Sequence, residues 1–512
     1  MQALQSYAVS APGFMGLNTE DSPTDLASGY ALVANNCVID QYGRIGARKG
    51  WQPINGTAVG LGTSAIEAIG EHIANDGTST IIVAGADKIF KFNGTNLVEL
   101  TYGGGGVAPT ITASKWHMVS LDGYFLMFQI GHDPLVYVPS ISTTTYTRLS
   151  ETAGYSGTVQ LADVAISAFG RLWNAVTTTD KVTIQFSDTK SPHKYSGGTS
   201  GTLDLTSVWP TGGDTIVGLG AHNNRLFIFG KQHILIYKDA STPASMSLDD
   251  AISGIGAVSR DCICETGTDI LFLSQSGVLS VSRTIQEKSA PIRDISRNVR
   301  TDLLTYLASE TSEPFAVWNQ KEGFYLLHFQ DSGRTYCFDS KGILQDGSSR
   351  TTTWTGFAPT ALYTTLDGDL LVGKEGVLGQ YGSYLDYTTT YRLDYKTTYT
   401  DFGPPIVSSL LKKLHVVIIG GNDQVITTKW AFDYAGTYSS QQQRTLVSSL
   451  AAEYNIGQYN INEYNADVPI NVINVNAGGS GKCVQVGVET NINGYGLSIQ
   501  KLEIYAKNGK IL

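Results

Sequence analysis

The thiols and imidazoles of this sequence are the first candidates for chemistry, and neither set has the spacing of a metal site. The five cysteines are Cys37, Cys262, Cys264, Cys337 and Cys483. The eight histidines are His72, His117, His132, His193, His222, His233, His328 and His415. Zinc sites group such ligands a few residues apart, and disulfide frameworks use an even number of cysteines. We therefore expect reduced, buried thiols, isolated histidines and no metal or cofactor.

Two glycine-rich stretches lack what a phosphate-binding loop requires. In GGSGKC, Asn476 stands where the first glycine of such a loop belongs, and Cys483 follows Lys482 where Ser or Thr is needed. The run Gly103–Gly106 is not followed by a helix that could present amide groups to a phosphate. We expect a turn at the first stretch and a flexible loop at the second.

Hydrolytic motifs are also missing from the sequence. It contains neither an H-E-x-x-H pair nor a G-x-S-x-G elbow, and QDGSSRTTTW departs from the Asp-box spacing of sialidase propellers. Acids such as Asp122, Asp133, Asp188 and Asp367 lie in expected turns, where their side chains bond local backbone. The sequence therefore predicts no enzyme and names no catalytic, cofactor-binding or metal-binding residue.

The elements around these residues follow a repeated pattern of two apolar β runs joined by a short turn. It occurs seven times, with a mean period of 48 residues. The units are IIVAGADKIFKF from Ile81, YFLMFQIGHDPLVYV from Tyr124, RLWNAVTTTDKVTIQF from Arg171, RLFIFGKQHILIYK from Arg225, ILFLSQSGVLSVSR from Ile270, FYLLHFQDSGRTYCF from Phe324 and DLLVGKEGVLGQYG from Asp369. This period is typical of β-propeller blades, and we predict six or seven of them. Unrelated hairpins in a sandwich are the alternative.

Other segments predict a second β domain and little helix. Strongly alternating runs after residue 385, such as LHVVIIGG and CVQVGVETN, indicate a sandwich-like domain. An Asn- and Tyr-rich stretch at 452–479 suits either a packed interface or a plain loop or strand. Apolar residues every four positions predict a short amphipathic helix within 293–310, whose arginines we assign to a solvated face.

The N-terminal segment predicts a short helix followed by a hairpin. Ser22 and Pro23 are typical of an N-cap and a first helical position, and Gly29 would end the helix. The next two β runs form a ribbon whose tip is 41–43, and a two-stranded ribbon needs another sheet to lie on. We therefore predict an N-terminal segment (1–55) that joins a C-terminal platform domain (386–512), with the propeller (56–385) between them.

Composition limits the function further. The chain has a net charge of −10 and only 16% charged residues. Tight nucleic-acid binding requires clustered Lys and Arg, so only loose contact with DNA is expected. The first residues lack the features of a secretion signal, and no run of about 18 apolar residues suggests a membrane span.

One set of sequence runs resembles a known family. The opening reads GLNTEDSPTDL from Gly16, an A-N-N-containing strand, and a Gly-Arg turn that leads to ARKGW. FGRLW at 169–173, GLGAHNNRLFIFGKQHILIY from Gly218 and SGVLSVSR ending at Arg283 continue it. The set resembles the tail nozzle proteins of short-tailed bacteriophages, of the tail tubular protein B or tail hub type. The resemblance covers most of the chain.

The resemblance implies a virion structural protein of the distal short tail, assembled in the host cytoplasm. It implies a propeller with a platform domain, and a homohexamer around a channel that retains and then conducts genomic DNA during ejection. Implied partners are the head-to-tail adaptor, tail fibres or spikes, and a needle or plug protein. The chain is short beside many such nozzles, which puts tip insertions and fibre docks in doubt, and the channel gate has no assigned residues.

Two other functions stay open at this stage. A β-propeller protein that binds or hydrolyses glycans would need clustered carboxylates and aromatic residues on the propeller axis. A cytoplasmic propeller scaffold that binds peptides would leave the N-terminal segment and the C-terminal domain unexplained.

Overall fold

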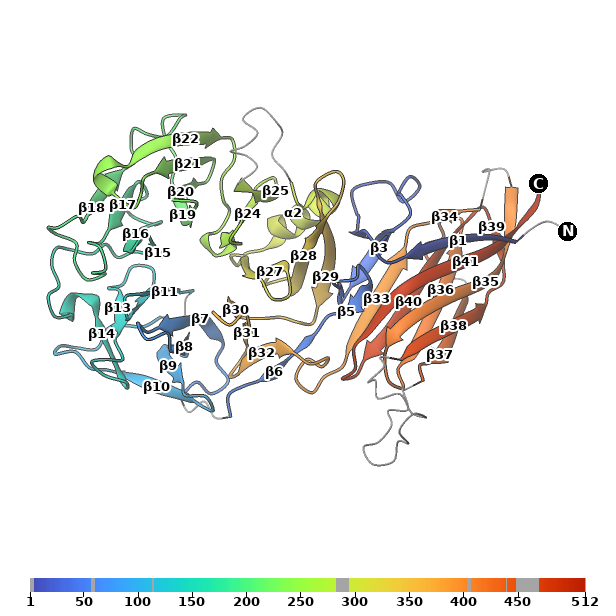
Figure 1. The fold of residues 1–512 in the computed structure, drawn as a ribbon, viewed down its shortest axis with the longest axis horizontal. Helices are drawn as coiled ribbons and strands as arrows, with labels where there is room; N and C mark the ends of the chain where they lie inside the picture. Colours follow the sequence, from blue (N-terminus) through green and yellow to red (C-terminus); the bar gives the residue numbers. More distant parts are fainter. Residues whose placement is uncertain are drawn as a thin grey trace, which may run out of the picture.

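The computed structural model describes residues 4–56, 60–112, 115–281, 294–402, 407–438, 440–447 and 469–511. The protein is built almost entirely from β-strands and has a ring-shaped body beside an elongated one (Figure 1). The described helices are α2 (Arg300–Ser309) and four short 3-10 helices, η1 (Leu149–Glu151), η2 (Pro243–Ser245), η3 (Arg260–Cys262) and η4 (Arg297–Val299). The fold is therefore all-β, as predicted.

The ring-shaped body is a seven-bladed propeller. Blades 1 and 2 are β7 (Ile66–Ile73), β8 (Ser79–Gly85), β9 (Lys88–Phe92) and β10 (Leu97–Tyr102), then β11 (His117–Leu121), β12 (Tyr124–Phe128), β13 (Leu135–Tyr137) and β14 (Thr145–Arg148). Blades 3 and 4 are β15 (Val164–Ala168), β16 (Arg171–Ala175), β17 (Thr183–Phe186) and β18 (Gly201–Asp204), then β19 (Ile216–His222), β20 (Arg225–Gly230), β21 (His233–Lys238) and β22 (Ser247–Ser253). Six of the seven predicted hairpins form the two middle strands of a four-stranded blade, and the hairpin from Ile270 forms the last two described strands of blade 5.

The remaining blades complete the ring. Blade 5 contains β23 (Cys264–Glu265), β24 (Ile270–Ser274) and β25 (Gly277–Ser280), and blade 6 contains β26 (Phe315–Asn319), β27 (Phe324–Phe329), β28 (Arg334–Ile343) and β29 (Ser349–Thr355). Blade 7 contains β30 (Ala361–Thr364), β31 (Leu370–Gly373), β32 (Leu378–Gly382) and β6 (Gly50–Pro53). Each innermost strand contacts the next, and β30 contacts β7, so the ring is closed.

An N-terminal strand closes this ring. β6 pairs with β32 and supplies the outermost strand of blade 7, so main-chain hydrogen bonds tie the start of the chain to its last blade. Residues 50–53 therefore belong to the propeller, although the sequence predicts its start at residue 56. The sequence pattern could not show this, because a four-residue strand is assigned by its distant partner and not by its own periodicity.

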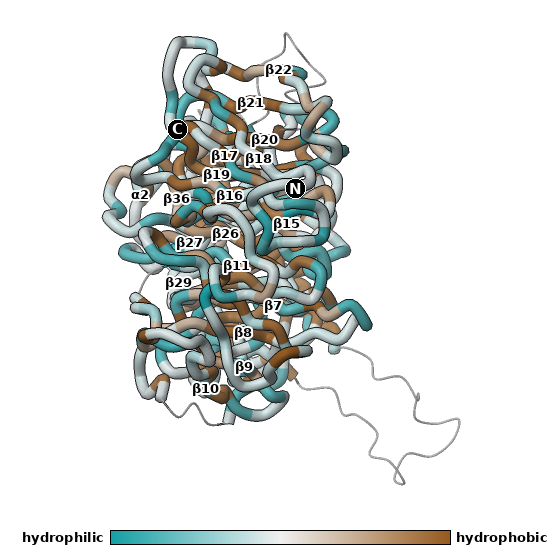
Figure 2. The backbone as a smooth tube through the Cα atoms, turned by 90° about the vertical axis from the view of Figure 1, so that its left-hand side faces the viewer, coloured by the Kyte–Doolittle hydropathy of each residue, from teal (hydrophilic) through white to brown (hydrophobic). Residues whose placement is uncertain are grey.

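The apolar residues of the blades are buried between neighbouring blades. Seven clusters of buried side chains fill the seven interfaces of the ring, including the one between blades 7 and 1. Figure 2 shows apolar segments concentrated within the blade strands. A single blade cannot cover both of its faces, so the closed ring is what makes each blade stable.

The elongated body is the platform domain, and two sheets form it. Platform sheet 1 contains β38 (Ile470–Asn476), β35 (Val407–Gly420), β41 (Leu497–Ile511), β5 (Ile45–Ala47) and β4 (Cys37–Ile39), with β1 (Leu4–Ser10) on β41 and β39 (Ser480–Gly481) on β35. Platform sheet 2 contains β3 (Tyr30–Asn35), β33 (Tyr391–Thr397), β40 (Cys483–Ile492), β36 (Val425–Phe432) and β37 (Ser440–Thr445), with β2 (Gly16–Leu17) and β34 (Thr400–Asp401). The predicted union of N- and C-terminal strands is confirmed.

One sheet runs through both bodies. β29 of blade 6 pairs with β3 through Thr353 and Asn35, and β3 continues into β33 of platform sheet 2. Buried side chains of blades 5 and 6 and of both platform sheets also belong to one cluster. The propeller and the platform are therefore joined by hydrogen bonds and by a shared core.

Two local predictions have different outcomes. The helix predicted from Ser22 is wrong: the segment makes a single turn, closed by a 2.9 Å bond from Asp25 N to Ser22 O. So few residues before Gly29 cannot offset the cost of helix nucleation. The hairpin tip at 41–43 is confirmed, and Gly43 adopts a positive φ of 74° there.

The predicted helix within 293–310 is shorter than expected. α2 begins at Arg300, and its Leu303 is buried in the core together with Val299. Arg297 and Arg300 form long ion pairs with Asp346 and Asp294, as suits a solvated face, while Arg293 lies outside the described residues. Of the Asn- and Tyr-rich stretch at 452–479, the described part begins at residue 469 and forms β38 and the loop after it.

Candidate functional site

One end of the propeller axis is closed by Arg260, which extends from η3 at the entrance of blade 5. Its Nη2 donates a 2.8 Å bond to the carbonyl of Lys115 at the entrance of blade 2. Its Nη1 donates to the carbonyl of Asp163 at the entrance of blade 3 and lies 3.5 Å from the Asp163 carboxylate. The Arg260 side chain is 10% exposed, so this cation links three blades within the ring.

Lys115 makes a second set of contacts at the same end of the axis. Its Nζ lies 3.5 Å from the centre of the Phe315 ring in blade 6 and donates a 3.2 Å bond to the carbonyl of Thr360 at the entrance of blade 7. Burial lowers the pKa of this lysine. These contacts of Arg260 and Lys115 join the entrances of blades 2, 3, 5, 6 and 7, so both side chains lie where a duplex would have to pass. In the described part of the chain, this end of the propeller axis is therefore obstructed by side chains.

A buried arginine holds the junction between propeller and platform. Arg48 is fully buried and donates two bonds to Asp386, of 2.9 and 2.7 Å, and one of 3.0 Å to Asn36 Oδ1. Its guanidinium also lies 4.0 Å from the centre of the Tyr391 ring. Arg48 follows β5 of the platform and precedes β6 of the propeller, so this contact network fixes the crossing point of the chain.

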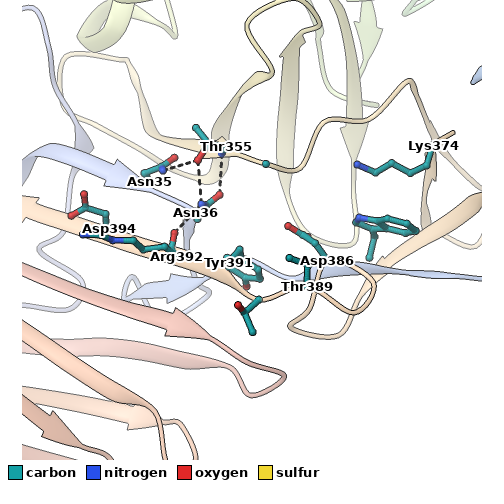
Figure 3. A pocket seen from close by; sticks show the side chains of 12 residues that line it. Asn35, Asn36, Thr355, Lys374, Asp386, Thr389, Tyr391, Arg392 and Asp394 are labelled. Carbon is teal, nitrogen blue, oxygen red and sulfur yellow. Dashed lines mark hydrogen bonds between the residues drawn. The ribbon is translucent and has the colours of Figure 1, made fainter.

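A cavity of about 630 Å³ opens beside this network (Figure 3). Its walls come from the end of β3, from the end of β29 and the loop after it, from Trp51 and Lys374 of blade 7, and from residues 386–394 at the start of the platform. Asn36 bonds to both sides: its Nδ2 donates to the Arg392 carbonyl at 2.8 Å, and its Oδ1 accepts from Thr355 N at 3.0 Å. The cavity therefore lies where the two bodies meet.

Lys374 and Asp386, two of the charged groups of this cavity, serve structural contacts. Burial lowers the pKa of Lys374 to about 8, and its Nζ donates to the carbonyls of Phe357 and Ala358. Asp386 is bound by Arg48. Burial raises the pKa of Asp394, whose Oδ1 has no hydrogen-bond partner among the described residues. A lysine bound to two carbonyls and a carboxylate bound to an arginine are not free for acid–base chemistry, so this arrangement stabilises the junction.

The outward side of platform sheet 1 carries a basic patch in an acidic protein. We name it the outer platform face and define it by Lys412, Lys413, His415, Lys501, Glu503 and Lys507. Its only acid is Glu503, which His415 and Lys501 bind, and these bonds lower the pKa of Glu503 to about 2. Lys412, Lys413 and Lys507 have no ion-pair partner in the described part of the chain. The face therefore has a net positive charge.

The residues that could do chemistry in the sequence are scattered in the structure. All five cysteines are free, and burial raises the pKa of each thiol. Among the described residues, no three His, Cys, Asp or Glu side chains gather as a metal site would require. The described helices include none long and apolar enough to cross a membrane.

Sequence reasoning missed the role of Arg48 at the junction, although this residue lies in the ARKGW run.

Comparisons with known proteins give matches of low identity and low TM-score. No family model matches the chain, and no curated protein matches it. A putative hybrid two-component system extracellular domain from B. thetaiotaomicron is 11% identical, with a TM-score of 0.38 over 65% of this chain and 41% of that chain. The Neurospora crassa Pan2 WD40 domain is 8% identical, with a TM-score of 0.38 over 65% and 96%. YCF48 from Cyanidioschyzon merolae is 10% identical, with a TM-score of 0.35 over 65% and 98%. The blade assignment rests on the strand pairing itself.

Proposed function

We propose that this protein is the tail nozzle of a short-tailed bacteriophage. The observation that carries the proposal is the position of the N-terminal segment. The nozzle resemblance implies that this segment joins a C-terminal platform, and β1 and β5 both pair with β41 near the C-terminus. A propeller scaffold that only bound peptides would not need fifty residues that lead from the platform into blade 7.

The conduit in this proposal lies between subunits. Arg260 and Lys115 fill one end of each propeller axis, so DNA passes through a channel that six copies surround. The acidic charge is concentrated in the propeller: residues 50–385 contain 31 acids and 22 Lys and Arg, whereas residues 386–512 contain ten of each. Acidic walls repel phosphates, so propellers that face the channel would keep DNA from adhering during ejection.

The proposal includes partners that the nozzle resemblance implies. They are the head-to-tail adaptor, fibres or spikes and a needle or plug protein, and the location is the distal short tail of the virion. The structure assigns no residue to a gate. The alternative of a glycan-binding or glycan-hydrolysing propeller has less support, because Asp163 on the axis is engaged by Arg260 and by Thr177.

Co-assembly with the adaptor ring of the same virus tests the proposal. The protein and the adaptor are purified separately, mixed and analysed by sedimentation velocity. A nozzle forms a stable complex with the adaptor, at a stoichiometry of six nozzle chains per adaptor ring. Failure to sediment with the adaptor at any ratio, together with binding to an oligosaccharide panel, would replace the proposal with the glycan alternative.

A further inference from the structure

Platform sheet 1 ends in two strands that each have one unpaired side. Its main order is β38-β35-β41-β5-β4, and β1 pairs with another part of β41 on the same side as β5, so β38 and β1 lie on opposite sides of the sheet (Figure 1). Within the described residues, β38 pairs only with β35, and β1 pairs only with β41. Each strand is seven residues long. A third end strand, β4, is covered by β29, whose Thr352 and Trp354 donate to the Cys37 carbonyl, so β38 and β1 remain as two uncovered edges of equal length.

Neither edge carries the features that normally prevent strand association. Soluble proteins protect edge strands with lysines, prolines, bulges or covering elements. β1 reads LQSYAVS and β38 reads INVINVN, without a charged residue or a proline. Neither strand shows a register shift against its partner. Such edges associate with other strands unless a partner covers them.

The exposed side chains of the two edges are also suited to burial. Ile470 and Val472 on β38 are 68% and 54% exposed, and Leu4 on β1 is 55% exposed. On the inner side, Tyr7 and Val9 of β1 pack against the same core cluster as Ile473 and Val475 of β38. A strand added to either edge would therefore extend both the sheet and its core.

We infer that β1 of one copy pairs with β38 of the next copy, so that platform sheet 1 continues from subunit to subunit. Adjacent strands in the order β38-β35-β41-β1 are all antiparallel. A rotation that relates successive copies about an axis along the strands keeps each strand direction, so β1 meets the neighbouring β38 in antiparallel orientation. Pairing two different edges is heterologous and closes into a ring when the rotation allows it.

This inference deepens the proposed function, because it supplies the contact that would hold the six copies together. It rests on the proposed ring for the number of copies but not for the pairing itself. It also gives a reason for the position of the N-terminal segment: β1 covers one side of β41 and presents an uncharged edge in its place.

Lysine substitutions at exposed edge positions test the inference without disturbing the core. One variant carries Ser6→Lys and Ala8→Lys on β1, and the other carries Val472→Lys and Asn474→Lys on β38. The matched control carries Gln441→Lys and Gln443→Lys on β37, the edge strand of platform sheet 2. Sedimentation velocity measures the species that each protein forms, and circular dichroism checks that each is folded.

The expected results differ between heterologous and isologous pairing. Each edge variant alone should be a 55.0 kDa monomer, while the control forms the same ring as the unmodified chain. An equimolar mixture of the two edge variants should form a one-to-one dimer, because one intact β1 and one intact β38 remain. Dimers of either variant alone would overturn the inference in favour of isologous pairing.

Hydrogen–deuterium exchange on the unmodified chain provides a second measurement, which does not depend on whether the substituted variants fold. Amides of β1 and β38 should exchange at least tenfold more slowly in the ring than in the dilute monomer, while β37 amides are unchanged. This inference would be overturned if both edge variants still formed rings and the amides of β1 and β38 still exchanged rapidly in the ring. That result would leave the nozzle proposal standing. An unmodified chain that stays monomeric even with the adaptor would refute both.

Discussion

Removal of Arg48 should loosen the junction between propeller and platform far more than removal of an exposed arginine. Arg48→Met leaves the Asp386 carboxylate, which is only 11% exposed, without its counter-ion, and it removes the bonds to Asn36 and to the Lys49 carbonyl. Breaking one partner of a buried ion pair costs about 3–5 kcal/mol. We therefore expect the free energy of unfolding measured for the first transition to fall by an amount of that order.

Urea unfolding followed by tryptophan fluorescence measures this loss, since Trp51 and Trp354 lie beside the network. The control is Arg225→Met, whose partner Asp249 lies on the propeller surface, and it should cost less than about 1 kcal/mol. The double variant Arg48→Met with Asp386→Leu should recover much of the loss, because two apolar residues leave no unpaired charge. A loss for Arg48→Met no larger than for the control would refute the role of the network.

Three further predictions follow from local geometry. Gly50→Ala should abolish soluble expression, because a Cβ there would lie 1.9 Å from the Leu385 carbonyl oxygen. The control Gly382→Ala, with open space around it, should express normally. Equal yields of the two variants would contradict the close contact between Gly50 and Leu385. Burial, and to a smaller extent the charge of Arg260, lowers the pKa of His117 to about 4, so its contribution to stability is complete above pH 6.5 and is lost as the pH falls toward 4. The variant His117→Gln should therefore show a urea midpoint that changes less with pH between 6.5 and 4 than that of the unmodified protein. An equal change of midpoint with pH in both proteins would disprove the assignment. The native protein should not react with a thiol reagent until it is denatured, because burial raises the pKa of all five cysteines; rapid labelling of Cys264, the least buried, would contradict this.

The sequence predicts the propeller well because each blade repeats one local pattern. A hairpin such as 225–238 shows its strands and turn within fourteen residues, and its apolar side chains lie between blades 4 and 3 or 5 as the period requires. The platform strands can also be predicted from the sequence, because strands such as β36 largely alternate between buried and half-buried residues.

The parts that sequence reasoning missed depend on distant partners. β6 is a blade strand only because β32 lies beside it, more than three hundred residues later. Arg48 reads as an ordinary basic residue until Asp386 is placed against it. The segment after Ser22 has the residues that are typical of a helix start. However, Asn18 Oδ1 accepts hydrogen bonds from the amides of Glu20 and Asp21, and these bonds hold residues 18–21 in a turn just before Ser22.

Electron microscopy of the assembled protein tests the central claim most directly. The account predicts a ring of six copies in which the hole lies between subunits and each seven-bladed propeller has a closed axis. In the presence of the adaptor, this hole should align with the adaptor channel and be wide enough for duplex DNA or be closed by loops. Isolated monomers, or a ring without a central hole in both samples, would contradict the account of this protein as a DNA conduit.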